Sequence, residues 1–411
     1  MKPVPATAIR FLALCSIFCT AAAITAQQPK TPAGTAGKDD TKKGLPKVTK
    51  PVIKRDESDL FFDPARPQIP FLKIELTPEN MAKWKAAPRT YTPAVMIENE
   101  KNKFDVEVKV KGSAGSTRDI DDKPAITMKI KGKDVKFHAM DKIHLNNSVQ
   151  DPAFMCEWLC ASILKDANYP HTRVTHARVM LNGRDLGIFV LKESFEEEWM
   201  KRHFPDLTGS FYEGGFLQDI DQKLVKHSGD PAEDNSDLTG LLNACREPDE
   251  KKRWAELEKV LDIDKFLTFM AMELMMCHWD GYSEKHNNYR IYFAPPSKKA
   301  IFVPHGMDQM FGDANYSVFH VPDSIVANAV FSRKEWRFAY FERVKQLTPL
   351  FSPARLNAKV DALYPRLAAI AKTTSPAAAQ QLDEQIRNFK DRVLKRGDGI
   401  VQQIRDVQSG K

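Results

Sequence analysis

Cysteine is scarce in this chain of 411 residues, which contains six in all. Two of them, Cys15 and Cys19, lie in the first 26 residues, so four remain for the rest of the protein. Four cysteines are too few for a fold built on disulfide bridges, and the chain has no Cys-x-x-Cys pair of the kind that holds zinc. We therefore expect the remaining cysteines to be buried thiols.

Long apolar segments are also absent beyond the N-terminus. Residues 11–24 are largely apolar and follow Lys2 and Arg10, and Ala26 offers a small residue at a cleavage position. This pattern is typical of a signal peptide over residues 1–26, with an N-terminal anchor as the alternative. No other run of about 18 apolar residues occurs, so we predict no stable membrane span. Export to the periplasm, the cell surface or the extracellular space is expected.

The chain also lacks the features of a nucleic-acid-binding protein. The net charge is +7, and much of the excess lies in residues 30–54, which are rich in Lys, Pro, Thr and Gly. Such a composition is typical of a disordered tether, which we place at residues 27–58. No basic stripe interleaved with aromatic residues follows it, so we expect no nucleic-acid partner.

Several familiar nucleotide-binding and catalytic motifs are missing. The turn at residues 111–116 (KGSAGS) matches neither Gly-x-x-x-x-Gly-Lys-Ser/Thr nor Gly-x-Gly-x-x-Gly. No Gly-x-Ser-x-Gly segment is present, which removes a common hydrolase nucleophile. His278, His286 and His305 do not have the spacing of a zinc site, and His-Glu-x-x-His does not occur, so zinc is not expected.

The first half of the chain predicts a mostly antiparallel sheet with one long helix. Apolar runs indicate strands at residues 70–76, 104–110, 125–130, 175–181 and 187–191. An Asn-Gly pair joins the last two strands as a hairpin. The sequence also predicts a helix over 78–87 capped by Thr77, and a second helix over 151–166 capped by Asp151.

The second half changes in texture after Glu193. Polar residues at 219–237 indicate surface loops. Asp262 caps a predicted helix through Cys277 that is apolar on nearly all sides, which places the helix in a core. Two short strands follow at residues 289–293 and 300–303, and three helices are predicted after residue 334. Together the two halves indicate an α+β protein.

Polar residues cluster in the loops that follow two hydrophobic elements, where catalytic groups are often held. Asp280 and Asp308 each enter a loop after such an element, and Asn287 and Asn288 lie between them. Carboxylate and amide oxygens are ligands that Mg²⁺ accepts, and the order Asp, Asn, hairpin, Asp is that of protein kinases. From the residues alone, capping of turns and helices is the commoner role. A metal-dependent hydrolase that uses the same acids also stays open.

Six segments carry a family resemblance. They are KVKGSAGS, KIHLNNSVQDP, VMLNGRDLGIFVLKES, GSFYEGGF, DIDKFLTFMAMELMMCHWDGYSEKHNNYRIYF and IFVPHGMDQMFG. With them the chain resembles the CotH (spore coat protein H) kinase family over residues 71–312. The resemblance implies an atypical protein-kinase-like fold of two lobes, with an antiparallel-sheet N-lobe and a mainly helical C-lobe. It also implies ATP-dependent phosphorylation of Ser residues on secreted or surface proteins, which would be the partners of this chain together with ATP.

The resemblance assigns the catalytic and metal-binding roles to the polar loops. Asp280 would be the catalytic acid, and Asp308 would hold Mg²⁺ or Mn²⁺ with Asn287 or Asn288. One departure from the family pattern bears on activity. Many relatives carry two acids in the stretch Pro-x-Asp-x-Asp, and here the first of them is Gly306. The loss favours an alternative in which the chain is a catalytically inactive, kinase-like binding module in cell-surface or coat assembly.

The resemblance also assigns residues to the nucleotide. These are Lys111, Gly112, Lys123, Lys129, Glu157 and Glu193. The first two would form a turn beneath the phosphates of ATP. Lys123 or Lys129 would reach the phosphates, oriented by Glu157, and Glu193 would lie near the nucleotide.

These patterns divide the chain into four parts. We expect a signal peptide at 1–26, a tether at 27–58, a CotH kinase-like domain at 59–330 with lobes at about 59–193 and 194–330, and a helical extension at 331–411.

Overall fold

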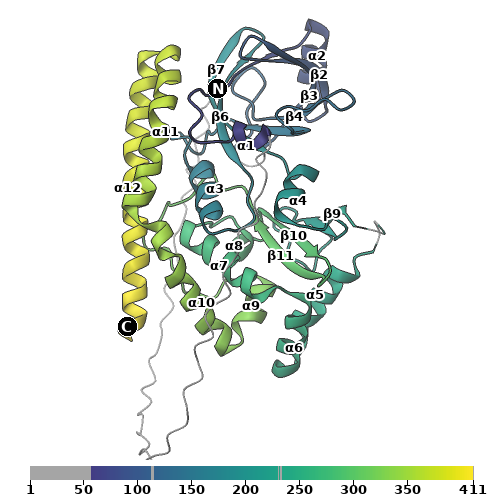
Figure 1. Ribbon diagram of the computed structural model, residues 1–411, viewed down its shortest axis with the longest axis vertical. Helices are drawn as coiled ribbons and strands as arrows, with labels where there is room; N and C mark the ends of the chain where they lie inside the picture. The colour runs from purple at the N-terminus through teal and green to yellow at the C-terminus, as the bar shows by residue number, and fades with distance from the viewer. Residues whose placement is uncertain (1–56, 113–114, 230, 232–233, 411) are drawn as a thin grey trace, which may run out of the picture. The chain divides into compact units, whose positions relative to one another are not determined.

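The computed structural model describes residues 57–112, 115–229, 231 and 234–410 (Figure 1). The expected signal peptide and nearly all of the expected tether lie outside these residues. All of the described residues belong to one compact unit, which extends to the end of the chain. None of the helices in the described residues combines the length and apolarity that a membrane crossing requires.

Seven strands close into a barrel in the first half of this unit. Their bounds are β1 Phe71–Glu75, β2 Thr92–Glu98, β3 Asn102–Val110, β4 Ile126–Ile130, β5 Lys142–Asn146, β6 Val174–Leu181 and β7 Arg184–Glu193. The order around the barrel is β1-β2-β3-β4-β5-β7-β6. Neighbours are antiparallel except β1 and β6, which pair in parallel and complete the closure.

The barrel forms because its strands alternate apolar and polar residues. In β3, Val106, Val108 and Val110 are buried while the residues between them are less so, which directs one face of the strand to the interior. Two short helices accompany the barrel, α1 Glu57–Phe61 and α2 Pro78–Ala86. The predicted cap of α2 is confirmed, because the Thr77 hydroxyl accepts a hydrogen bond from the Asn80 backbone N–H at 3.2 Å.

The next helix, α3 Cys156–Asp166, begins five residues later than the sequence predicted. Phe154 has a φ of +59°, a left-handed conformation that a helix cannot contain. The Asp151 carboxylate still serves the helix, since it accepts a hydrogen bond from the Cys156 backbone N–H at 2.7 Å. The prediction of Asp151 as the first cap residue was therefore wrong in position, although its side chain does bind the start of the helix.

A second sheet has the order β11-β10-β8-β9. Its strands are β8 Phe211–Glu213, β9 Val225–Ser228, β10 Tyr289–Ala294 and β11 Lys299–Pro304. The last two confirm the strands predicted at 289–293 and 300–303. The prediction that residues 219–237 are only loops was wrong, because β9 pairs with β8 inside that segment.

Helices make up most of the remaining chain. They are α4 Glu197–His203, α5 Ser236–Arg246, α6 Glu250–Val260, α7 Ile263–Met276, α8 Tyr282–Lys285, α9 Ile325–Phe331, α10 Lys334–Leu347, α11 Pro353–Thr374 and α12 Pro376–Gln408, with a 3₁₀ turn η1 at Thr348–Phe351. α7 is the most buried of them and carries the predicted cap, as Asp262 accepts from the Lys265 backbone N–H. α11 and α12 run side by side, and α11 also contacts β7 and α3 (Figure 1).

The four cysteines of the described residues are free thiols and all are buried, as predicted. The observed elements confirm an α+β protein.

Candidate functional site

A charged cluster lies where the barrel meets α3, with Lys192 and Glu157 buried and its other two members partly exposed. It consists of Lys111 just after β3, Asn146 at the end of β5, Lys192 on β7 and Glu157 on α3. The Lys192 ammonium forms an ion pair with one carboxylate oxygen of Glu157, and the Asn146 amide donates to the other. Lys111 donates to the Asn146 side-chain oxygen. Asn146 therefore links Lys111 to the ion pair, and both lysines are held beside one carboxylate.

Asp308 is the electrostatic neighbour of this cluster. Burial and the negative charge of Glu157 raise the pKa of Asp308 to about 6, against the opposing effect of Lys192 and Lys111. Burial and the charge of Lys192 lower the pKa of Lys111 to about 7. Burial alone would raise the pKa of Glu157, but Lys192 and Lys111 lower it overall. Opposed pKa shifts among neighbouring ionisable side chains are typical of functional sites.

The loop after α7 forms a second polar group. Asn287 donates to one carboxylate oxygen of Asp280 at 2.8 Å, and Asn288 donates to the other at 3.0 Å. Asn287 in turn accepts a hydrogen bond from the Leu217 backbone N–H at 2.6 Å. The loop can turn this tightly because Cys277 and Asn288 both take positive φ values, +60° and +54°. The two amides fix the orientation of the Asp280 carboxylate.

Hydrogen bonds join this loop to the segment that carries Asp308. His278 bonds the backbone carbonyl of His305 at 2.8 Å, and the His305 backbone N–H donates to the Asn288 carbonyl at 2.9 Å. Further along, the Phe311 backbone N–H donates to the Met276 carbonyl at 2.9 Å. The segment on both sides of Asp308 is thus tied to the end of α7 and to the loop of Asp280.

Gly306 lies in contact with this second group. It has a φ of +67°, and a Cβ added to it would stand 2.3 Å from the side-chain oxygen of Asn288. The Asn288 amide therefore occupies the space that the first acid of the family pattern would need. An acidic side chain at this position requires Asn288 to move away from Asp280.

Neither Lys123 nor Lys129, the two lysines that Glu157 was expected to orient, forms an ion pair with Glu157. Lys123 donates to the Ile188 carbonyl at 2.8 Å and lies 4.9 Å from the ring centres of Phe154 and Phe189. Lys129 is exposed on β4. The lysine that contacts Glu157 is Lys192, which the sequence reasoning did not single out.

Glu193 and Gly112 also have defined surroundings. Glu193 is buried in ion pairs with Arg173 at 3.0 Å and with Arg202, on the side of β7 opposite to its neighbour in sequence. Gly112 follows Lys111 directly and has a φ of +105°, a conformation that favours glycine.

A divalent metal fits only part of this arrangement. Within the described residues, no three His, Cys, Asp or Glu side chains are grouped to hold a metal ion. Asp308 and the Asn288 oxygen beside Gly306 are oxygen donors of the type that Mg²⁺ accepts. Since Mg²⁺ at nucleotide sites commonly takes one or two carboxylates together with phosphate oxygens, the donors present fit a metal that arrives with a phosphate ligand.

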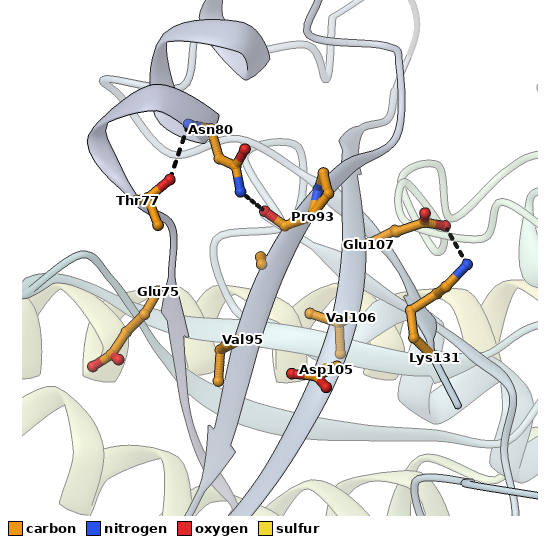
Figure 2. Close-up of a pocket in the computed structure, with 10 residues that line it drawn as sticks. Glu75, Thr77, Asn80, Pro93, Val95, Asp105, Val106, Glu107 and Lys131 are labelled. Atoms are coloured by element: carbon orange, nitrogen blue, oxygen red, sulfur yellow. Dashed lines mark hydrogen bonds and ion pairs between the residues drawn. The ribbon is translucent and has the colours of Figure 1, made fainter. Parts of the chain in front are cut away.

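A hollow elsewhere on the barrel contains none of these residues. Figure 2 shows it beside α2, bordered by β1, β2 and β3. Asn80 donates to the Pro93 carbonyl at 3.0 Å on one side, and Lys131 pairs with Glu107 at 3.3 Å on the other. Its one lysine is already paired and its one amide already donates to the backbone, so we place the chemistry at the charged cluster and not here.

Comparison with known proteins adds the family. Residues 108–399 match the model described as CotH kinase protein, well over half of the chain. The chain belongs to the CotH kinase protein family. The match includes the charged cluster and both polar loops, and it continues through α11 and into α12.

Individual CotH relatives are distant. The inner spore coat protein H of Bacillus subtilis is 24% identical over 299 residues, which are 67% of this chain and 80% of that protein. Invasin CotH2 of Rhizopus delemar is 28% identical over 191 residues, 41% of this chain and 32% of the invasin. The chain thus matches about a third of the length of that relative.

One solved structure is also similar, the Helicobacter pylori proinflammatory kinase CtkA. The two share 11% identity with a TM-score of 0.30, over 71% of this chain and 97% of the other. A similarity of that size supports no further argument.

Proposed function

We propose that this member of the CotH family is an exported atypical protein kinase of two lobes, which transfers the γ-phosphate of ATP to Ser hydroxyls of secreted or surface proteins. The observation that carries the proposal is the buried Lys192–Glu157 ion pair, with Lys111 and Asp308 as its electrostatic neighbours. The family names a kinase, and the coat protein and invasin among the relatives support a surface location.

Lys192 and Lys111 would bind the phosphates of ATP. Glu157 holds Lys192 in place, as a helix carboxylate holds the phosphate-binding lysine in kinases. Burial lowers the pKa of Lys111 to about 7, so an arriving phosphate would favour its charged form. The backbone at Gly112 would lie beneath the same phosphates.

Asp280 would orient the acceptor hydroxyl and accept its proton. Its carboxylate is fixed by Asn287 and Asn288, so little orientation remains to be lost when the acceptor binds. Asp308 and Asn288 would hold Mg²⁺ or Mn²⁺. When bound, the metal supplies positive charge that stabilises the transferring phosphoryl group.

A second function is favoured by Gly306. A chain that lacks the first acid of the family pattern can keep the fold and bind a coat or surface partner without phosphotransfer. In that case the purified chain would bind its partner, and neither Asp280 nor Lys192 would matter for that binding.

The test is transfer of labelled phosphate from Mg·ATP to the chain itself and to casein as a generic Ser-containing acceptor. Asp280→Asn should reduce incorporation by about 10²-fold or more, the usual contribution of a catalytic proton acceptor. Lys192→Met should also reduce incorporation, because the phosphates lose a positive partner. Lys129→Met, an exposed change on β4, should leave it unaltered.

Two results would contradict the proposal. Phosphate incorporation that is unchanged in both variants would show that the assigned site does not carry out the transfer. Binding of Mg·ATP without any incorporation into either acceptor would favour the inactive binding module.

A further inference from the structure

Arg396 of α12 is a buried charge that binds the frame of the site. Its side chain is almost fully enclosed, with 1% of the residue exposed. The guanidinium donates to the Leu274 carbonyl at 2.7 Å and to the Met275 carbonyl at 2.9 Å, both in the last turn of α7. It also donates to the carbonyls of Ala314 at 3.2 Å and Tyr316 at 2.6 Å. One side chain therefore joins two segments that are far apart in sequence.

The same face of α12 is shaped to hold the second segment. A Cβ added to Gly399 would stand 2.1 Å from the Ala314 carbonyl oxygen, so only glycine allows this approach. Gln403 accepts a hydrogen bond from the Val318 backbone N–H at 2.8 Å and donates to the Tyr316 carbonyl at 3.2 Å. Arg396, Gly399 and Gln403 are three and four residues apart, which places them on one face of the helix.

The two segments lead directly to the candidate catalytic residues. The last turn of α7 precedes Asp280, and the segment at 314–318 follows Asp308. Between them, the Cys277 thiol donates to the Asp313 carbonyl at 3.2 Å. The carbonyls at a helix end lack partners within the helix and carry partial negative charge, so a guanidinium there is favourable.

We propose that Arg396 is a positioning residue, through which α12 fixes the loop of Asp280 relative to the segment of Asp308. A buried guanidinium is costly unless its donors are satisfied, and here backbone carbonyls of both segments accept from it. Loss of the guanidinium would remove a donor from all four carbonyls, and although Leu274 keeps the Cys277 backbone N–H and Tyr316 keeps Gln403, it would loosen both segments at once. The geometric part of this proposal is independent of the proposed kinase activity, and its effect on turnover rests on that activity.

Amide hydrogen exchange of the full chain tests the geometric part. Arg396→Met and Gly399→Ala disturb the same contact, one by removing donors and the other by adding bulk. Each should speed exchange by about tenfold or more in residues 277–288 and in residues 311–318 together, while the barrel keeps its protection. The matched control is Gly240→Ala in α5, where an added Cβ meets nothing within 4 Å.

Turnover of Mg·ATP into casein tests the consequence. Arg396→Met should lower kcat by about tenfold or more with a smaller change in KM for ATP, because the phosphate-binding lysines lie on other elements. Arg396→Lys should recover part of kcat, since an ammonium can donate to some of the same carbonyls.

The outcomes separate the two proposals. If the wild-type chain transfers no phosphate, the proposed function fails, and the exchange pattern still decides the role of Arg396. Unchanged exchange in both segments for Arg396→Met and for Gly399→Ala overturns the positioning role. If Arg396→Met does not fold, Gly399→Ala and Arg396→Lys give the same comparison.

Discussion

Replacement of Lys192 by Met should destabilise the protein strongly, because it leaves a carboxylate buried without its partner. The side chains of Lys192 and Glu157 are only 11% and 6% exposed. Breaking a buried pair by removing one partner costs about 3–5 kcal/mol. We expect a loss near the lower end, about 3 kcal/mol, since Lys111 and Asn146 stay close to the carboxylate and offset part of its charge.

A double-mutant cycle measured by urea unfolding gives the interaction itself. Glu157→Gln alone leaves Lys192 buried without a counter-charge, and the double variant removes both charges. The double variant should therefore lose about 2 kcal/mol less than the sum of the two single changes. Lys129→Met on the exposed side of β4 is the control and should change stability by at most about 0.5 kcal/mol.

Two results would refute this reasoning. Additive losses from Lys192→Met and Glu157→Gln would show that the two side chains do not depend on each other. A Lys129→Met loss as large as that of Lys192→Met would show that burial and pairing do not explain the difference between the lysines.

Three further predictions concern protonation and packing. The pKa of Asp308, the proposed metal ligand, is raised to about 6, and the pKa of Lys111, which would bind the phosphates, is lowered to about 7. The affinity for Mg·ATP, measured by calorimetry, should therefore be highest between about pH 6 and pH 7. Lys111→Arg should remove the decline in affinity on the alkaline side. Gly306→Ala should cost about 1–2 kcal/mol more in urea unfolding than Gly183→Ala, because both have positive φ but only the first would clash with a neighbour. Equal losses would contradict the clash. Burial raises the pKa of Glu273 from 4.5 to about 8, so the folded state holds the carboxyl proton more tightly than the unfolded state. The stability that this proton contributes is therefore lost as the pH rises from 4.5 to about 8. Glu273→Gln should flatten that decline, and a slope equal to that of the wild type would refute the assignment.

Local chemistry made part of this structure predictable. Thr77 and Asp262 precede helices and bind their first turns as the sequence indicated, because a cap depends only on residues a few positions away. The Asn-Gly pair at Asn182 joins β6 and β7 for the same reason. The order of Asp280 and Asp308 around a hairpin was visible as well, since that hairpin is a local element.

Contacts between distant elements were not predictable in this way. Lys192 meets Glu157 only because the fold brings a strand of the barrel and a helix outside it within side-chain reach, and no residue close in sequence to either one indicates that contact. The parallel pairing of β1 with β6 and the reach of Arg396 from α12 to α7 have the same origin.

One signal for Lys192 was nevertheless present. Successive residues of a strand point to opposite faces, so Lys192 and Glu193 cannot both face the same site. The family resemblance assigned Glu193 to the nucleotide, but this side chain binds Arg173 and Arg202 on the other face. The start of α3 was misplaced for a different reason, because the positive φ of Phe154 has no signature in the sequence.

The central claim is that nucleotide and metal bind together at Asp308. The most direct measurement is the thermal stability of the purified chain during titration with ATP and Mg²⁺ or Mn²⁺, with Asp308→Ala in parallel. A ligand that binds only the folded state should stabilise it by about 2.7 kcal/mol at 100 times its Kd. The proposed kinase predicts a clear rise for the wild-type chain that requires the metal and is lost in Asp308→Ala. No rise at millimolar ATP, or an equal rise in both proteins, would contradict it.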